Sequence, residues 1–174
     1  MLVTWLPTIE ISRSVDPVAA GWETFLYQIV GIVAGLLVTV FMRGRSDHRL
    51  VGVVISLLLI AGVLGMLLAP SWSTVWVVLA GLSGGSSLVI ALALVGERTR
   101  TGAEAARLSG MAQSVGYLLA VIGPAGAGLL FDLTGSWTSA LLGVIAVTVI
   151  QIVVCLLAGR DRYVGHRPDA RGLR

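Results

Sequence analysis

Lysine is absent from this 174-residue sequence, and all twelve basic side chains are arginines. Charged residues of either sign make up only 12% of the chain, whereas a soluble globular domain carries about 25%. By contrast, 56% of the residues are hydrophobic and the mean hydropathy is +0.94. The scarcity of charge excludes an ordinary soluble domain and predicts an integral membrane protein.

Reactive side chains are also scarce. The single cysteine, Cys155, cannot form an intrachain disulfide, and the two histidines, His48 and His166, lie outside the apolar runs. No His, Asp or Glu lies at mid-membrane depth beside a serine, so an intramembrane hydrolase would lack a base. The sequence has neither a metal-ligand cluster nor a Walker-type or dinucleotide-binding glycine motif. We therefore predict that the protein is not an enzyme and binds no metal or cofactor.

Long apolar runs predict an all-α membrane protein with five complete transmembrane helices, because one span needs about 20 residues. The predicted spans cover residues 17–42, 50–69, 73–95, 102–131 and 137–158. Residues 1–9 are apolar but too short to cross, and we interpret them as the last turns of a truncated helix. Residues 1–158 are thus expected to form one helical bundle, followed by a polar tail at 159–174.

The arginines indicate the orientation of this bundle. Alternating spans would place eleven of the twelve on one side, namely Arg43, Arg45, Arg49, Arg98, Arg100, Arg107, Arg160, Arg162, Arg167, Arg171 and Arg174. By the positive-inside rule this side is the cytoplasm. We therefore predict a multi-pass protein of the plasma membrane with a cytoplasmic C-terminus. Because topology accounts for the basic charge, no nucleic-acid partner is expected.

The predicted helix at 102–131 differs from a simple lipid anchor. It begins with a capping box, Thr101 and Glu104, and Pro124 within the span is expected to bend it. A stripe of small residues with one amide follows one face, comprising Gln113, Gly116, Ala120, Gly123 and Ala127. Tyr117 lies one turn from Gln113. We favour Gln113 and Tyr117 as hydrogen-bond donors in a transport path; the alternative is a kinked packing helix.

The predicted helix at 17–42 carries a second stripe, formed by Thr24, Gln28, Gly31 and Gly35. Gly31 and Gly35 form a GxxxG pair, which lets two helix backbones approach closely in lipid. The stripe is either a packing seam or a path lining that includes Thr24, Tyr27 and Gln28, since polar residues at membrane depth favour function.

Glu23 lies about two turns into the same helix. We expect it at the membrane interface, and the alternative is a role in proton coupling.

The predicted helix at 73–95 contains a small-residue patch. Gly81 and Gly85 are explained by tight helix packing. Ser83 and Ser87, one turn apart, either belong to the same packing surface or face a substrate. The remaining spans, 50–69 and 137–158, carry few polar side chains and are predicted to be peripheral and lipid-facing.

Three segments resemble a known family. RLSGMAQSVGYLLAVIGPAGAGLLFDLTGSW, at Arg107 to Trp137, resembles the eleventh-helix region of the cyanate and 2-nitroimidazole transporter family, within the major facilitator superfamily. TWLPTI, at Thr4 to Ile9, resembles the end of that family's seventh helix. AGWETFLYQIVGI, at Ala20 to Ile32, is similar to its eighth helix, although Val33 replaces the proline that usually follows.

The resemblance implies the C-terminal six-helix half of a twelve-helix secondary transporter, lacking the first six helices and most of the seventh. In such a carrier the seventh, eighth, tenth and eleventh helices line the central cavity, and rocking of the two halves gives alternating access. The implied cargo is a small organic anion or small polar molecule. The implied partners are that solute, membrane lipid, and either the missing N-terminal half or a second copy. The alternative is a non-transporting membrane scaffold or a truncated, inactive gene product.

Overall fold

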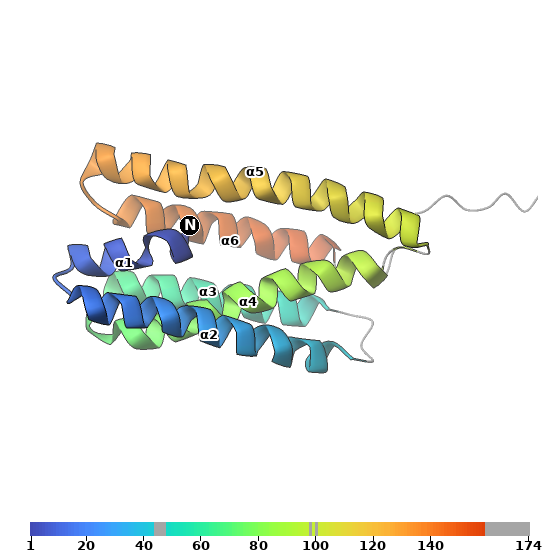
Figure 1. Ribbon diagram of the computed structural model, residues 1–174, viewed down its shortest axis with the longest axis horizontal. Helices are drawn as coiled ribbons and strands as arrows, with labels where there is room; N and C mark the ends of the chain where they lie inside the picture. Colours follow the sequence, from blue (N-terminus) through green and yellow to red (C-terminus); the bar gives the residue numbers. More distant parts are fainter. Residues whose placement is uncertain (44–47, 98, 100, 159–174) are drawn as a thin grey trace, which may run out of the picture.

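The computed structural model describes residues 1–43, 48–97, 99 and 101–158, so the predicted tail at 159–174 lies outside the described residues (Figure 1). The described chain forms α-helices with one short 3-10 turn. These elements are α1 (Leu2–Ser12), α2 (Pro17–Met42), α3 (Arg49–Leu68), η1 (Pro70–Trp72), α4 (Ser73–Glu97), α5 (Gly102–Thr134) and α6 (Thr138–Ala158). Five of the α-helices are long and apolar enough to cross a membrane.

Local signals determine several helix ends. The Asp16 carboxylate accepts hydrogen bonds from the amides of Val18 (2.9 Å) and Ala19 (3.3 Å), at the start of α2. The Thr101 hydroxyl accepts one from the Glu104 amide (3.2 Å), at the start of α5. This helix ends at Gly135, whose φ of 66° lies in the left-handed region. It continues three residues past the predicted end at 131, and α1 continues three past residue 9.

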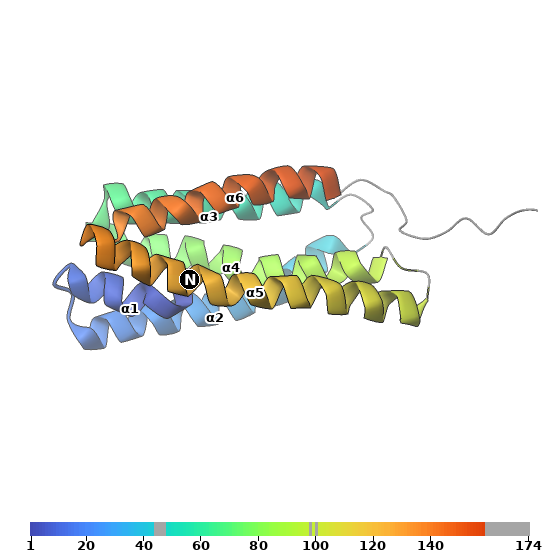
Figure 2. The same cartoon turned by 90° about the horizontal axis from the view of Figure 1, so that it is seen from above.

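The helices form two groups on either side of α4. Figure 2 shows α3 and α6 together on one side of α4, and α1, α2 and α5 on the other. The most extensive contacts join α2 to α4, followed by α3 to α4 and α3 to α6. In both views α1 lies between α2 and α5 (Figures 1 and 2). The end of the bundle that holds Asp16 is called the Asp16 end below, and the opposite end the Arg43 end.

Backbone contact between glycines joins α2 to α4. A Cβ atom on Gly85 would overlap the carbonyl oxygen of Gly31, and one on Gly81 would lie 2.7 Å from the carbonyl oxygen of Tyr27. A Cβ on Gly35 would lie 3.2 Å from Val89 of α4. Such close approach is the main way for helices to gain van der Waals energy in lipid, where apolar side chains alone give no preference.

Aromatic side chains near the Asp16 end hold the short helix α1. The Trp5 ring lies 5.1 Å from that of Trp137, which stacks on Phe131 with centroids 4.4 Å apart. The Trp5 indole N–H donates a hydrogen bond to the Pro124 carbonyl of α5 (2.9 Å). These contacts tie α1 to both α5 and α6.

The glycine contact predicts a position-specific effect of one methyl group. Gly85→Ala should lower the free energy of unfolding by about 1–3 kcal/mol, because α2 and α4 must move apart to admit the Cβ. Gly143→Ala on α6 is the matched control, since a Cβ there has nothing within 4 Å. It should be neutral or stabilising by about 0.5–1 kcal/mol. Denaturant unfolding in detergent compares the two variants. Equal changes in the free energy of unfolding would show that the contact between α2 and α4 tolerates a side chain.

A second prediction concerns the Trp5 indole. Trp5→Phe keeps an aromatic ring but removes the hydrogen bond to Pro124, which should cost about 0.5–1.5 kcal/mol. Hydrogen exchange of the α1 amides should therefore accelerate by about two- to tenfold. Trp22→Phe on the exposed face of α2, where Trp22 is 65% exposed, should leave this exchange unchanged. If α1 exchanges equally in both variants, the indole does not hold it.

Candidate transport path

Most of α5 is exposed in this chain. Every residue from Gly110 to Gly123 is exposed, and Ala127 is the one fully buried residue of this helix. A Cβ on Gly116 or Gly123 would meet nothing within 4 Å. The small-residue stripe is therefore open from Gln113 to Gly123, and its last member, Ala127, is the one that packs within the described chain.

The polar side chains of α5 lie on one face of the helix, and α1 covers this same face nearer the Asp16 end. Pro124 and Gly128 face α1, since Pro124 accepts the Trp5 hydrogen bond and a Cβ on Gly128 would lie 3.0 Å from the Trp5 ring. Tyr117 precedes Pro124 by seven residues, or two turns, and Gln113 precedes Tyr117 by four, so all share one face. The Gln113 amide donates to the Ser109 hydroxyl (3.3 Å).

The part of α5 that carries Gln113 and Tyr117 lies away from the part that contacts α1. Figure 1 shows α1 and α5 running in the same direction, towards the Asp16 end. Tyr117 and Gln113 lie about 10 Å and 16 Å before Pro124 along the helix axis. Measured in the same direction, Met1 lies only about 6 Å before Trp5. Tyr117 and Gln113 are therefore further from the Asp16 end than the first residue of α1. Tyr117 is 69% exposed.

On α2, the three predicted path residues have different environments. Tyr27 is buried, and a Cβ on Gly84 of α4 would lie 2.6 Å from its hydroxyl oxygen. The Thr24 hydroxyl donates to the Ala20 carbonyl of its own helix (3.0 Å). Gln28 is exposed, about 16 Å along the axis from Pro17 and thus near the middle of the span. Of the three, Gln28 alone presents an exposed polar group.

Ser83 and Ser87 lie on another side of α4. Ala80 packs against α3, because a Cβ on Gly62 would lie 3.1 Å from the Ala80 amide nitrogen. Ser83 and Ser87 follow Ala80 by three and seven residues and share this face. Ser83 is fully buried, and the Ser87 hydroxyl donates to the Ser83 carbonyl (2.8 Å). The structure thus separates the two serines from Gln28 and Gln113, whose helices lie on the other side of α4.

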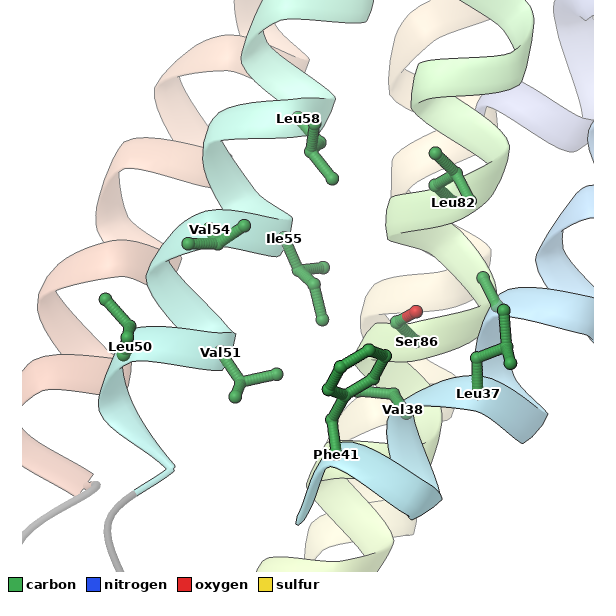
Figure 3. A pocket seen from close by; sticks show the side chains of 11 residues that line it. Leu37, Val38, Phe41, Leu50, Val51, Val54, Ile55, Leu58, Leu82 and Ser86 are labelled. Carbon is green, nitrogen blue, oxygen red and sulfur yellow. The ribbon is translucent and has the colours of Figure 1, made fainter.

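An apolar groove between α2, α3 and α4 is distinct from this candidate path. Figure 3 shows Phe41, Val51 and Ile55 around it, with Leu82 and Ser86 contributed by α4. Its volume is about 320 Å³, and Ser86 supplies the one polar side chain among its lining residues. A lining of this kind suits a lipid acyl chain better than a polar solute.

Sequence reasoning missed two features near the Asp16 end. Trp5 bonds to α5 and contacts Trp137, and neither contact was predicted. Glu10 lies on the buried face of α1, four residues from Leu6, and this spacing could have indicated burial. Among the described residues, no three His, Cys, Asp or Glu side chains lie close enough to hold a metal ion.

Comparison with known proteins gives consistent matches. The sequence profile of the Major Facilitator Superfamily matches residues 1–173. The chain is 35% identical over 162 residues to the 2-nitroimidazole transporter of Escherichia coli (strain K12). It is 38% identical over 165 residues to the uncharacterized transporter YycB of Bacillus subtilis (strain 168). Each match covers 93% of this chain and 41% of the relative, so the chain spans about two fifths of their length.

A third relative, from Thauera aromatica, is named as a candidate anionic 4-hydroxy-benzoate permease. It is 39% identical over 107 residues, which cover 62% of this chain and 65% of the relative. No solved structure gives a significant match. The five apolar helices indicate a multi-pass membrane protein, and the matches confirm the resemblance drawn from Arg107 to Trp137. The chain belongs to the major facilitator superfamily of membrane transporters.

Proposed function

We propose that this chain is the C-terminal half of a secondary carrier that moves a small solute across the plasma membrane by alternating access. The Arg43 end faces the cytoplasm, where eleven arginines are expected, and the Asp16 end faces outside. The solute is a small organic anion or small polar molecule. Two relatives support this class, one named as a 2-nitroimidazole transporter and the other as a candidate anionic 4-hydroxy-benzoate permease.

The observation that carries the proposal is the mismatch between polarity and exposure in α5. Of the five spans, α5 has the lowest mean hydropathy and also the smallest buried share. A helix surrounded by lipid should be the most apolar, because polar groups in hydrocarbon are costly. The exposed face with Gln113 and Tyr117 is therefore adapted to further protein or to a water-filled path.

A second transmembrane unit is required to cover this face. Gly116 and Gly123 leave room for another helix backbone along α5. We infer that this unit is the missing N-terminal half, or a second copy, and that the solute binds between the two units near the midplane. Gln113 and Tyr117 of α5 and Gln28 of α2 are the proposed polar lining. Ser83 and Ser87 are weaker candidates, because their face is directed towards α3.

The alternative is that the chain is a non-transporting membrane scaffold or a truncated, inactive gene product. Reconstitution into liposomes distinguishes the proposed carrier from this alternative. Liposomes containing this chain with its completing half should take up 2-nitroimidazole or 4-hydroxybenzoate, whereas liposomes with unrelated membrane protein should not. Lack of uptake of either probe, and of other small organic anions, by the complete assembly would favour the alternative.

Substitution of Gln113 tests the lining directly. In the assembled carrier, Gln113→Ala should lower the initial uptake rate by about two- to tenfold, the equivalent of one lost hydrogen bond. Gln151→Ala on α6 is the control, because it removes the same amide from a peripheral helix. Protein amounts in the membrane should match in both variants. Normal uptake by Gln113→Ala would make Gln113 a packing residue.

Water access gives an independent prediction. In a Cys155→Ser background, Gln113→Cys should react with a membrane-impermeant maleimide, because a thiolate forms only in water. Val147→Cys on α6 serves as the control, since Val147 is 65% exposed and its helix is expected to face lipid. Equal labelling of the two cysteines would contradict a path along α5.

A further inference from the structure

The apolar groove between α2, α3 and α4 reaches the Arg43 end of the bundle. Its α2 wall runs from Ala34 to Phe41, next to the last residue of that helix, and its α3 wall runs from Leu50, the second residue of α3, to Leu58. At a rise of about 1.5 Å per residue, the two walls are about 10–12 Å long. One leaflet of the hydrocarbon core is about 15 Å thick, half of a total of about 30 Å. The groove therefore starts at the membrane surface and extends through most of one leaflet.

The groove is open on its outer side and closed at its floor. Leu37, Phe41 and Leu50 form the rim, and these residues are 52–68% exposed. Val38 and Ile55 form the floor and are buried. Figure 3 shows the Ile55 side chain pointing from α3 towards Phe41 of α2. An apolar floor with a long open side fits a linear hydrocarbon chain that lies along the groove.

Basic side chains flank the mouth of the groove. Arg43, the C-cap residue of α2, is exposed and follows Phe41 by two residues. Arg49 is the first residue of α3 and directly precedes Leu50. From position 43 to 49 the sequence contains three arginines and one aspartate. The first turn of α3 carries no acidic side chain, and the N-terminal end of a helix dipole also favours an anion. The mouth is therefore electropositive, whereas the groove itself is apolar.

We propose that the groove binds one acyl chain of an anionic phospholipid whose phosphate group lies beside Arg43. An apolar groove that leads to an electropositive mouth is complementary to a molecule with a hydrocarbon chain and an anionic head. Guanidinium groups bind phosphate oxygens through charge-assisted hydrogen bonds. In the orientation proposed above, the Arg43 end lies in the cytoplasmic leaflet, where anionic lipids make the surface potential negative. The proposal does not depend on solute transport, because it requires only a bilayer.

The lining of the groove favours a lipid over a further helix. Helices that pack in lipid approach through small residues, as α2 and α4 do through Gly31 and Gly85. No glycine lines the groove, and its rim consists of the larger side chains of Leu37, Phe41 and Leu50. A flexible chain can lie between such side chains, whereas they would hold a helix backbone away from the floor.

Native mass spectrometry of the chain in detergent micelles tests the headgroup. Phosphatidylglycerol and phosphatidylcholine with identical acyl chains are titrated separately. The wild type should bind the first phosphatidylglycerol molecule about fivefold more tightly, which is the effect of one arginine on an anionic lipid at a membrane surface. Arg43→Gln should remove most of this preference. Arg107→Gln is the matched control and should preserve it, since Arg107 is exposed on α5, which contributes no residue to the groove.

A second pair of variants tests the groove. Val54→Trp places a large ring in the groove from its exposed rim, so the first bound molecule of both lipids should be lost. Val147→Trp makes the same exchange at an exposed position on α6, outside the groove, and should leave lipid binding unchanged. Circular dichroism shows whether each variant folds.

Equal affinity of the wild type for the two lipids would overturn the proposal, as would equal effects of Arg43→Gln and Arg107→Gln. Undiminished lipid binding by folded Val54→Trp would show that the acyl chain lies elsewhere and would also overturn it. Displacement of the lipid by inorganic phosphate would indicate a site for a free anion and contradict a lipid site. None of these results bears on solute uptake, which is measured separately.

Discussion

The glycine contact between α2 and α4 is the constraint on which the bundle depends. Because a Cβ on Gly85 would overlap the Gly31 carbonyl, the two backbones touch with no side chain between them. Apolar side chains alone do not drive helices together in lipid, so close backbone packing must supply much of the attraction. Since α4 also packs on α3, and α3 on α6, this seam joins the two groups of helices on either side of α4.

The same physics explains why α5 is different. Its glycines are as suited to close packing as those of α2 and α4, yet Gly116 and Gly123 face open space in this chain. An unused glycine stripe beside exposed Gln113 and Tyr117 has little purpose against lipid. The span with the smallest buried share is thus the one that most requires an external partner, and this supports a carrier assembled from two units.

Local signals made the helices predictable from the sequence. The apolar runs and the caps at Asp16 and Thr101 act within a few residues, so the observed helices lie close to the predicted ranges. The direction of Ser83 was not predictable, because its face depends on where α3 and α2 contact α4. The burial of Glu10 depends on α1 continuing past residue 9, and its spacing of four residues from the buried Leu6 was the one sequence signal for it. The roles of Gln28 and Gln113 stay predictions.

The position of α1 is where these features meet. It contacts α5 and the start of α6 through Trp5, which bonds to Pro124 and lies against Trp137. It also packs on α2, at the end of the bundle where the Glu10 side chain is buried. Because α1 lies between α2 and α5, its position sets the spacing between the helices that carry Gln28 and Gln113.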